Sequence, residues 1–463
     1  MIVMKFGGTS VADARCLREV AALVAEPSCQ PCLAVVSAAS GVTDLLLATA
    51  QQAAAGAESE VEASLARLRS RQRQMVAEAI ADAGRRARVT ENVERLLADL
   101  SRLLTGVLLL REVSSRSQDL IASCGEKLSS TILAGVLEDR GAKAVAVSTE
   151  RLVITDDAFG AANPQLGQTT ERLREAMLPL LAEGTIPVLT GFIGGTEEGV
   201  TTTLGRGGSD YSASIVGNAL DADEIWIWTD VDGVMTADPR LVPSARSLPA
   251  VSYAEAAELS YFGAKVIHPR TVIPAIEKRI PLRVRNTFNP SFAGTLIHHM
   301  GTPTEHVVKA ITSIRNLSLL NVEGAGMMGV PGVAARVFGA VARRNVSVLM
   351  ISQASSEHSI CFAVQRPAAE LVVRDLEEEF ARELHRQDIN GIYVSHGAVI
   401  VAAVGEGMRG SPGVAGRLFS ALGRAGVNVI AIAQGSSELN ISLVVSEADE
   451  NAAVAAIHEE FIG

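Results

Sequence analysis

Short apolar runs rich in β-branched residues alternate with long helical patterns over residues 1 to about 300. The runs have the length of buried strands, and in chain order they are Ile2 to Phe6, Leu33 to Val36, Lys143 to Val147, Ile186 to Leu189, Glu224 to Trp228 and Leu282 to Arg285. Strands that alternate with helices are typical of a mainly parallel sheet covered by helices on both faces. The pattern therefore predicts an α/β domain over residues 1–300.

One stretch of this region departs from the alternation. From Ser59 to Leu110 the chain is rich in Ala, Leu, Arg and Glu, and no strand-like run interrupts it. Its helical pattern, with few breakers beyond Gly84 and Gly106, predicts a two-helix excursion from the sheet. The polar segment from His298 to Glu305, which contains Gly and Pro, is the best candidate for a linker.

After this segment the chain repeats itself. The sequence GVAARVFGAVARRNVSVLMISQASSEHSI, from Gly332, aligns without a gap with GVAGRLFSALGRAGVNVIAIAQGSSELNI, from Gly413, at an offset of 81 residues. Each copy has the pattern strand, turn, helix, strand, strand, helix, which predicts two tandem α+β modules of the ferredoxin-like type. We place these modules at residues 301–394 and 395–463.

The two modules are unequal in their strands. Residues Ile392 to Ser395 can form a closing strand for the first copy, whereas the second copy lacks such a strand. A β-branched stretch from Val307 to Ile314 precedes the first copy. We therefore expect strands to be shared between the modules, so that neither module folds alone.

Composition narrows the class of protein. At roughly 150 residues per domain, 463 residues correspond to about three domains. Lys and Arg total 41 against 52 Asp and Glu, so the net charge of −11 gives nucleic acid no general attraction. Aromatic residues make up only 4%, too few for the stacking platforms of single-strand binding. We expect no nucleic-acid partner.

The cysteines and the N-terminus indicate a cytoplasmic protein. Five cysteines are scattered along the chain, unlike the disulfide framework of a small secreted domain. Cys29 and Cys32 form a C-x-x-C pair, but no second pair completes a zinc site, so a metal or redox role is a minor alternative. Lys5 interrupts the N-terminal apolar stretch, and no run of 18 apolar residues occurs. We expect no membrane segment and no metal held by the protein.

The first motif with chemical meaning is KFGGTS, residues 5–10, at the end of the first predicted strand. Glycines at this place let backbone N–H groups approach an anion, and the start of the following helix adds the positive end of its dipole. The motif is neither a P-loop nor a dinucleotide fingerprint, so an ordinary glycine turn is the alternative. Lys5 favours the phosphate site, because it adds a fixed cation where a transferring phosphoryl group would develop charge.

The second motif is TLGRGGSDY, residues 203–211, before a helical pattern from about Ser212 to Leu220. Three glycines ahead of a Ser-Asp pair again predict an anion site at a helix N-terminus. Arg206 is suited to bind a carboxylate through two hydrogen bonds. The alternative is an ordinary capped loop.

The third motif is WTDVDGV, residues 228–234, followed by DPR at residues 238–240. It comes directly after an apolar strand, and ligands of open parallel sheets bind beyond the carboxyl ends of the strands. The segment therefore suits a nucleotide, with an acidic turn as the alternative. Lys265, further along the chain, is a candidate for phosphate binding or a solvated lysine.

Two glycine patterns need a different interpretation. GAGMMG at residues 324–329 and GEGMRG at residues 405–410 both fit G-x-G-x-x-G, at the repeat offset of 81 residues. The next predicted strands, Val346 to Ser352 and Val427 to Ala433, carry no acidic residue for a ribose, and each module is too short for a dinucleotide-binding fold. We interpret both patterns as tight turns of the repeat.

Together these motifs resemble the aspartate kinase family. The resemblance is carried by KFGGTSVA, the turn from Ser37 to Thr43, SCGEKLS, TTLGRGGSDYSA, IWTDVDGV, FGAKVIHPRT and the paired QASSE and QGSSE. It is strongest to the kinase part of the threonine-sensitive bifunctional aspartate kinase/homoserine dehydrogenase, without the dehydrogenase. It implies an amino-acid kinase fold followed by two tandem ACT-like modules. The implied reaction is ATP-dependent phosphorylation of the β-carboxylate of L-aspartate to 4-phospho-L-aspartate.

The resemblance implies roles in aspartate binding and in catalysis. Lys5 and Asp210 are implied to be catalytic. Glu126 is implied to bind the α-amino group of aspartate and Arg206 its α-carboxylate. The same pocket is implied to be lined by Ser37, Thr43 and Ser209.

The resemblance also implies an ATP site. The residues it assigns to this site are Gly7, Gly8, Thr229, Asp230, Arg240 and Lys265. Mg²⁺ is expected on the ATP oxygens rather than in a cage of protein ligands. Met235 departs from the family, which often has Tyr after the DGV turn, so a contact to adenine or ribose is in doubt.

In the modules, Gln353 and Gln434 occupy equivalent repeat positions and resemble glutamines that bind an effector amino acid, with threonine favoured over lysine. A homodimer or a dimer of dimers through the modules is the expected assembly. Two other functions stay open: a catalytically inactive amino-acid sensor, and a kinase of the same fold that acts on another amino acid such as glutamate.

Overall fold

The computed structural model describes residues 1–263, 267, 269–300, 306–353 and 358–463. These residues form two compact units. The first unit comprises Met1–Val234, Ser247–Ala257 and Lys265–Thr302, and the second comprises Met235–Arg246, Glu258–Ala264 and Pro303–Gly463. Two short segments of the predicted first domain therefore belong to the second unit.

The first unit is built on an eight-stranded sheet with the order β3-β4-β2-β1-β7-β9-β10-β8. Its strands are β1 (Ile2–Phe6), β2 (Cys32–Val36), β3 (Ala144–Val147), β4 (Ile186–Thr190), β7 (Glu224–Thr229), β8 (Ala250–Ser252), β9 (Leu282–Asn286) and β10 (Thr295–His298). All neighbours pair in parallel except β9 and β10. The prediction of a mainly parallel sheet is confirmed, and each of the six predicted runs forms a strand. A small antiparallel pair, β5 (Ile193–Gly195) and β6 (Thr201–Thr203), lies outside this sheet.

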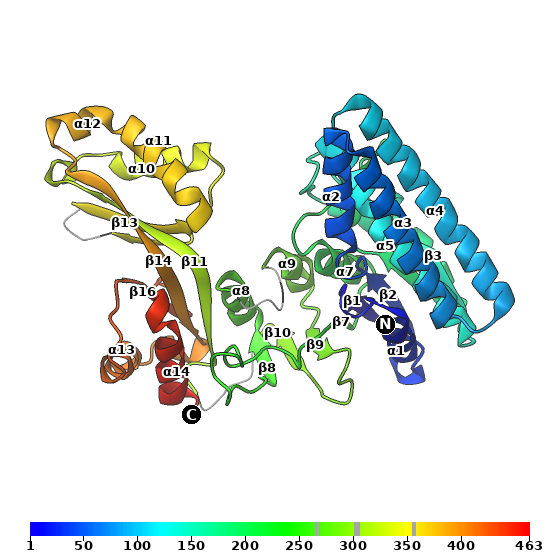
Figure 1. The fold of residues 1–463 in the computed structure, drawn as a ribbon. Helices are drawn as coiled ribbons and strands as arrows, with labels where there is room; N and C mark the ends of the chain where they lie inside the picture. Colours follow the sequence, from blue (N-terminus) through cyan, green and yellow to red (C-terminus); the bar gives the residue numbers. More distant parts are fainter. Residues whose placement is uncertain (264–266, 268, 301–305, 354–357) are drawn as a thin grey trace. The chain divides into compact units, whose positions relative to one another are not determined.

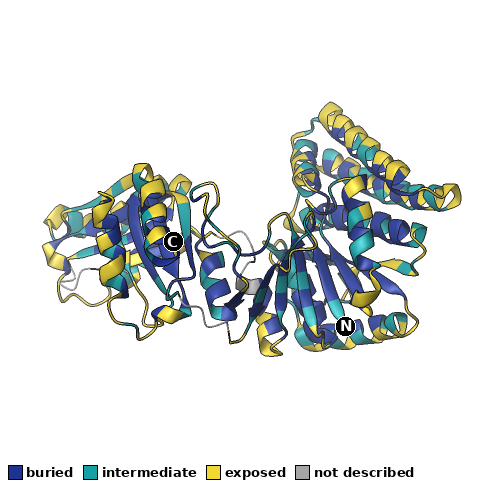
Figure 2. Ribbon diagram, turned by 90° about the horizontal axis from the view of Figure 1, so that it is seen from below, coloured by how far each residue is buried: buried dark blue, intermediate teal, exposed yellow. Residues whose placement is uncertain are grey.

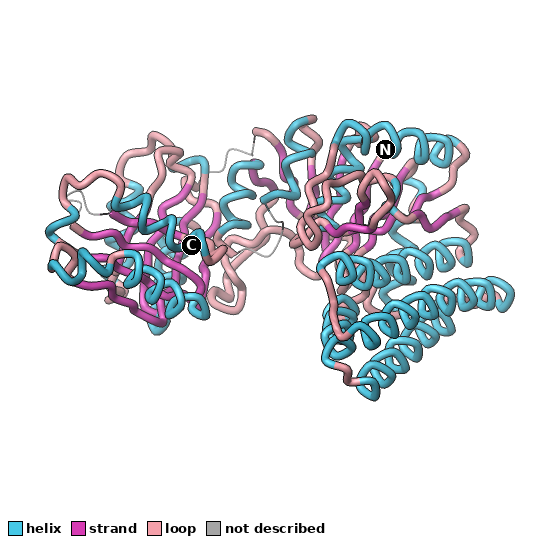
Figure 3. Tube along the Cα trace, turned by 90° about the horizontal axis from the view of Figure 1, so that it is seen from above, coloured by secondary structure: helices cyan, strands magenta, loops and turns pink. Residues whose placement is uncertain are grey.

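Helices cover both faces of the sheet (Figure 3). The helices of the first unit are α1 (Ala14–Val24), α2 (Val42–Ala55), α3 (Glu58–Ala79), α4 (Ala83–Leu110), α5 (Ser115–Asp139), α6 (Leu166–Ala182), α7 (Gly208–Ala219) and α9 (Pro269–Glu277), and α8 (Tyr253–Tyr261) passes from the first unit into the second. Met4 and Phe6 of β1 point into a core shared with α1 to α5. Because side chains alternate along a strand, Lys5 points to the opposite face, toward α7.

The two-helix excursion predicted for residues 59–110 is present as α3 and α4, which lie side by side in Figure 1. The chain turns between them at residues 80–82, and Gly84 and Gly106 both lie inside α4. The helix tolerates these glycines because a buried stripe including Val93, Leu97 and Leu100 packs on α5 and α2.

The long helix α5 is the central helix of the first unit. It is apolar and long enough to cross a membrane, but 83% of its apolar window is buried inside the fold. The dark interior and exposed outer faces of the helices are visible in Figure 2. The apolar composition of α5 therefore reflects its place between the sheet and helices α1 to α4.

The second unit contains a six-stranded antiparallel sheet with the order β12-β13-β11-β14-β16-β15. Its strands are β11 (Ala310–Glu323), β12 (Met350–Gln353), β13 (Ser359–Gln365), β14 (Gly391–Val404), β15 (Ala431–Ala433) and β16 (Asn440–Ser446). The central strands β11 and β14 run through both modules. Residues 317–323 of β11 pair with β13, whereas residues 398–404 of β14 pair with β16. The predicted boundary between residues 394 and 395 falls inside β14, and the boundary at 301 lies outside the described residues, so both stay predictions.

Two hydrophobic cores lie between this sheet and the helices that cover it. Its helices are α10 (Val333–Arg343), α11 (Ala369–Glu379), α12 (Ala381–Arg386), α13 (Val414–Arg424) and α14 (Glu450–Phe461). Helices α10 and α11 pack on β11 and β13 around Phe362. Helices α13 and α14 pack on β14 and β16, and their core includes Ala237 and Val242 from the segment 235–246.

Both G-x-G-x-x-G patterns form tight turns in which the glycines contact the protein's own backbone. A Cβ on Gly326 would lie 2.7 Å from the Cα of Asp388, and one on Gly407 would lie 2.8 Å from the Cα of Val307. Any side chain there would collide with the neighbouring chain segment. These glycines are explained by packing within the second unit.

The continuous central strands predict that one module cannot fold without the other. We expect a fragment of residues 395–463 to be unfolded because residues 398–404 of β14 lose β11, which pairs with them along one whole side. NMR or circular dichroism of that fragment and of residues 303–463 measures this. A well-dispersed spectrum from a monomeric 395–463 fragment would contradict the prediction.

Candidate active site

A cavity of about 280 Å³ lies in the first unit, where the end of β1 and the loop after β2 meet the N-terminus of α7. It is lined by Lys5, Ser37, Ala38, Thr43, Glu126, Phe192, Gly205, Gly207, Gly208, Ser209 and Asp210. Six of the residues assigned by resemblance to aspartate binding and catalysis therefore share one cavity: Lys5, Ser37, Thr43, Glu126, Ser209 and Asp210. They come from β1, the loop after β2, α2, α5 and α7.

Lys5 is the cation of this cavity. Its side chain is only 11% exposed, and its Nζ lies 2.6 Å from Oδ1 of Asp210. Asp210 is in the first turn of α7, where an acidic side chain is stabilised by the helix dipole. The ion pair therefore fixes the ammonium group beside the helix N-terminus, whose first N–H groups have no partner inside the helix. The ammonium group and the free N–H groups of the helix start together suit an anionic group such as a phosphoryl group or a carboxylate.

Gly8, two residues after β1, lets this loop lie against the loop after β2. A Cβ on Gly8 would lie 2.8 Å from the carbonyl oxygen of Ala38, and the Ser40 N–H donates to the Gly8 carbonyl at 3.0 Å. A Cβ on Gly7 would lie 3.5 Å from Nζ of Lys5. Gly7 thus lies next to the lysine, Gly8 lies against the loop after β2, and neither glycine lines the cavity itself.

Glu126 is a buried carboxyl with one satisfied oxygen. Oε1 accepts a hydrogen bond from the Ala38 N–H at 3.0 Å, while Oε2 has no hydrogen-bond partner among the described residues. Gly125 allows α5 to approach this loop, because a Cβ there would lie 2.6 Å from Cβ of Ala38. Burial raises the pKa of Glu126 to about 8, although the Ala38 hydrogen bond acts in the opposite direction. A cationic donor in the cavity would satisfy Oε2 and favour the ionised form.

The glycine loop before α7 supplies backbone rather than side chains to the cavity. Gly205 and Gly207 have φ of +74° and +70°, in the left-handed region that favours glycine. Ser209 is buried at the helix start, whereas Arg206 is exposed and lies outside the cavity lining. The structure therefore brings the loop to the site but does not place the Arg206 side chain in the cavity.

Phe192 lines the cavity and was missed by the sequence analysis. It has φ of +66°, unusual for an aromatic residue, and its N–H donates to Oγ of Ser212 at 2.9 Å. A Cβ on Gly208 would lie 2.5 Å from its ring, so the pair packs as closely as glycine allows. The available signal was the sequence TGFIGG after a buried strand, which none of the three motif patterns covers.

The residues assigned to ATP are only partly brought together. Thr229 is the last residue of β7, the neighbour of β1, and its Oγ1 donates to the following residue, Asp230, at 3.2 Å. Arg240 belongs to the second unit, where Asp238 pairs with its guanidinium and raises its pKa. Lys265 lies outside the described residues.

Asp232 lies two residues after Asp230 in the same motif. Its Oδ1 accepts hydrogen bonds from the side-chain amides of Asn286 and Asn289, at 2.8 and 3.1 Å. Met235, the departure from the family pattern, is half-buried in the second unit. Within the described parts of the chain, no group of three or more His, Cys, Asp or Glu residues could hold a metal ion.

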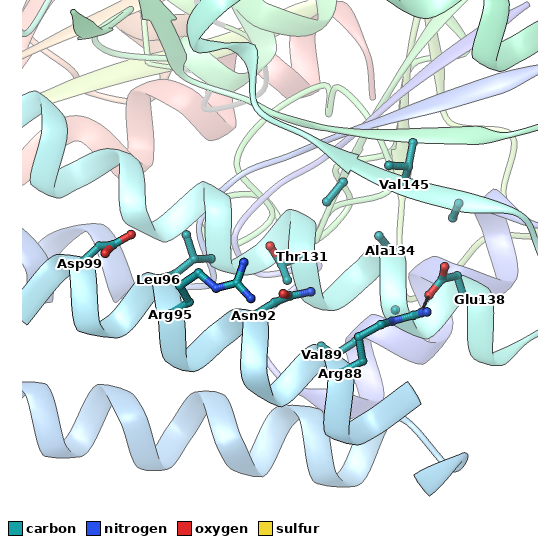
Figure 4. A pocket seen from close by; sticks show the side chains of 13 residues that line it. Arg88, Val89, Asn92, Arg95, Leu96, Asp99, Thr131, Ala134, Glu138 and Val145 are labelled. Carbon is teal, nitrogen blue, oxygen red and sulfur yellow. Dashed lines mark hydrogen bonds and ion pairs between the residues drawn. The ribbon is translucent and has the colours of Figure 1, made fainter. Parts of the chain in front are cut away.

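The first unit has a second hollow, of about 400 Å³, between α4, α5 and the edge strand β3 (Figure 4). Arg88 of α4 pairs there with Glu138 of α5, and Val145 of β3 lies on the opposite wall. Its lining contains none of the residues assigned to substrate or ATP. The smaller cavity at Lys5 is therefore the candidate active site.

The glutamines assigned to an effector both end edge strands of the second unit. Gln353 is the last residue of β12 and lines a hollow of about 400 Å³ together with Pro331 and Gly332 before α10. Gln434 directly follows β15, and both side chains are exposed. The two positions are equivalent in the repeat.

Comparison of the sequence with known protein families identifies the family of both units. Residues 1–286 match the Amino acid kinase family, and residues 320–380 and 401–461 match the ACT domain. Aspartokinase 1, chloroplastic, of Arabidopsis thaliana is 34% identical over 476 residues, which cover 99% of this chain and 80% of that protein. The chain belongs to the aspartokinase family.

Other aspartokinase relatives are longer than this chain. Bifunctional aspartokinase/homoserine dehydrogenase 2, chloroplastic, of Arabidopsis thaliana is 38% identical over 469 residues, and the bifunctional enzyme of Haemophilus influenzae is 37% identical over 469 residues. Each comparison covers 99% of this chain but 50% and 56% of the relative. The chain thus spans about half the length of these relatives.

The aspartokinase fold is also shown by solved structures. Escherichia coli aspartokinase III in complex with aspartate and ADP, in its R-state, superposes with a TM-score of 0.83 at 32% identity over the whole of both chains. The complex of that enzyme with lysine and aspartate, in its T-state, gives a TM-score of 0.82. The amino-acid kinase fold with ACT modules predicted from the sequence is confirmed.

The raised pKa of Glu126 predicts how stability depends on pH. Between the ordinary value of 4.5 and the folded value of about 8, the folded protein keeps a proton that the unfolded chain has lost. Stability therefore falls as pH rises through this window, by about 1.4 kcal/mol per pH unit. Glu126→Gln removes this loss, so its melting temperature, measured without ligand from pH 5 to 9, should increasingly exceed that of the wild type up to pH 8. The exposed variant Glu112→Gln is the control, and parallel profiles for all three proteins would contradict the prediction.

Proposed function

We propose that this chain transfers the γ-phosphoryl group of ATP to the β-carboxylate of L-aspartate and forms 4-phospho-L-aspartate and ADP. The observation that carries the proposal is the cavity that holds Lys5 between the N-terminus of α7 and the buried carboxyl of Glu126. Membership of the aspartokinase family supports it, as does the solved aspartokinase III complex with aspartate and ADP.

The chemistry needs positive charge rather than a base. The β-carboxylate of aspartate is already ionised near neutral pH, because an unperturbed carboxyl has a pKa of about 4. One of its oxygens attacks the γ-phosphorus, and the bond from this phosphorus to the β–γ bridging oxygen breaks as ADP leaves. Lys5 and the N–H groups of α7 offset the repulsion between the two anions. Asp210 keeps the lysine in place through the 2.6 Å ion pair.

Aspartate would be held by its α-carbon substituents. The free Oε2 of Glu126 is a suitable acceptor for the α-ammonium group, which would lower the pKa of Glu126 and release its proton. Ser209 and the N–H groups around Gly207 are suited to the α-carboxylate, and Arg206 would reach it only by turning in from its exposed position. Ser37 and Thr43 complete the wall.

ATP would enter as its Mg²⁺ complex, with the ion on phosphate oxygens and water. Gly7 and Gly8 would admit the phosphates beside Lys5, and Thr229 and Asp230 would contact the nucleotide at the neighbouring strand. Arg240 and Lys265 are the remaining proposed ligands. In this arrangement Arg240 would have to exchange its partner Asp238 for phosphate.

The ACT modules make an amino-acid effector part of the proposal. We propose threonine as the effector, bound at Gln353 and Gln434, and a homodimer or dimer of dimers through the modules. The aspartokinase III complex with lysine and aspartate supports regulation by an amino acid, although its effector is lysine. The cytoplasm is the proposed location, supported by five free cysteine thiols.

The reaction predicts an acyl phosphate that hydroxylamine traps. With Mg²⁺ and ATP, we expect a coloured hydroxamate that depends on aspartate and is far weaker with glutamate. Lys5→Met should lower kcat by about 10²- to 10³-fold, since it removes the cation at the reacting phosphoryl group. Lys143→Met, at an exposed lysine paired with Glu183, is the matched control and should keep full activity.

Each other outcome of this assay has a defined meaning. Hydroxamate with glutamate alone would replace the proposal by a glutamate kinase. No product with either acid would indicate an amino-acid sensor without activity.

The proposed effector site predicts selective loss of inhibition. Threonine should inhibit the wild type, and replacing both Gln353 and Gln434 by Ala should abolish this inhibition, because each glutamine would lose its hydrogen bonds to the effector. Rates are compared with each variant's own rate without threonine. Gln365→Ala, an exposed glutamine at the end of β13, is the control. Inhibition by lysine but not threonine would overturn the choice of effector.

A further inference from the structure

Helix α5 carries a second buried carboxyl, Asp119, that the proposed chemistry does not use. Its side chain is 4% exposed, and it forms no ion pair within the described parts of the chain. Burial raises the pKa of Asp119, against the opposing effect of its hydrogen bonds. Burying a carboxyl without a cation lowers the stability of the fold unless hydrogen bonds to the carboxyl compensate. The hydrogen-bond partners of Asp119 therefore indicate its role.

Asp119 joins two loops to α5. Oδ2 accepts the N–H groups of Gly160 and Thr203, each at 2.9 Å, and Oδ1 accepts the Thr203 hydroxyl at 2.8 Å. Thr203 is the last residue of β6, and its carbonyl accepts the N–H of Ala162 at 2.9 Å. One carboxyl thus clamps the end of β6 and the 160–162 turn onto the helix.

The clamped strand end leads directly into the glycine loop of the cavity. The N–H of Leu204 donates to the carbonyl of Phe192 at 2.9 Å, and a Cβ on Gly205 would lie 3.1 Å from the carbonyl oxygen of Gly160. From Gly205 onward this loop lines the cavity and continues into α7. The position of the loop therefore depends on where Asp119 holds Thr203 and Gly160.

The same helix holds Glu126. Residues seven apart lie two turns apart on one face of an α-helix, separated by roughly 10.5 Å along its axis. Helix α5 thus carries, as one rigid piece, the carboxyl proposed for the α-ammonium group and the anchor of the loop proposed for the α-carboxylate. Together they would fix the α-carbon of the substrate relative to Lys5.

We infer that Asp119 is a positioning residue that sets the selectivity for the length of the substrate side chain, by holding the Gly205–Ser209 loop in register with Glu126. The inference rests on the proposed kinase function. With the α-carbon fixed, only a side chain of one length presents its carboxylate to the phosphoryl group beside Lys5. A loosened loop would let the α-carbon shift and accept the longer glutamate.

The chain offers a matched control on the same helix. Asp139, at the end of α5, accepts the N–H groups of Ala81 and Asp82 at 2.8 and 3.0 Å, and its neighbours lie outside the cavity lining. Asp119→Asn is the conservative variant, because its amide oxygen can accept both N–H groups while its NH₂ donates to the Thr203 hydroxyl. Asp119→Ala removes all three bonds.

The experiment measures kinetics of the full chain with aspartate, glutamate and Mg-ATP. For Asp119→Ala we expect the KM for aspartate to rise by about tenfold or more, as loss of several buried hydrogen bonds implies. The KM for ATP should stay within about twofold, and the aspartate-to-glutamate ratio of kcat/KM should fall by about tenfold. Asp119→Asn should largely restore both values, and Asp139→Ala should match the wild type. If Asp119→Ala fails to fold, Thr203→Val tests the same clamp by removing one bond, with smaller shifts in the same direction.

Amide hydrogen exchange provides a readout that does not depend on the reaction. Exchange at Gly160 and Thr203 should accelerate in Asp119→Ala and not in Asp139→Ala. Unchanged selectivity in a folded Asp119→Ala, or equal effects of both Ala variants, would overturn the inference. If the wild type makes no hydroxamate, the proposed function fails, whereas the exchange experiment still confirms or refutes the clamp.

Discussion

The ion pair between Lys5 and Asp210 is the interaction on which the rest of the site depends. Two anions must meet in the proposed reaction, and the lysine can offset their repulsion only if it is fixed where they meet. Strand β1 directs Lys5 away from the core that contains Met4 and Phe6, and α7 presents Asp210 at a distance of 2.6 Å. The carboxylate holds the ammonium group while the free N–H groups of the helix start add further positive potential.

Helix α5 is the second structural constraint on the site. Its apolar surface is buried between the sheet and helices α1 to α4, so it has little freedom to move. Such a helix is a suitable support for Glu126, whose burial raises its pKa to about 8, and for Asp119, which holds the loop on the other side of the cavity. Their raised pKa values mean that both buried carboxyls reduce the stability of the fold near neutral pH, and a cationic ligand would relieve this cost at Glu126.

In the second unit, the sheet joins the two modules into one structure because β11 and β14 pass through both. The segment 235–246, which follows the WTDVDGV motif, is part of this unit. The backbone carbonyl of its Thr236 accepts the N–H of Ile311 at 2.8 Å. The hydroxyl oxygen of the same residue lies 3.0 Å from Nε2 of the buried His458. A segment bearing a proposed ATP ligand, Arg240, is therefore held by the strands and the last helix of the ACT modules.

The sequence by itself determined the parallel sheet, the repeat and the two glycine motifs at the cavity, because periodicity and glycine motifs are local properties of the chain. It also indicated that Lys5 and Glu126 act together, but only through resemblance. The tertiary structure alone decided that Phe192 lines the cavity, that Arg206 is exposed and that Arg240 belongs to the second unit. It also revealed the Asp119 clamp, since that residue and Thr203 are 84 positions apart. Contacts between distant segments depend on how whole layers pack, and no local pattern specifies them.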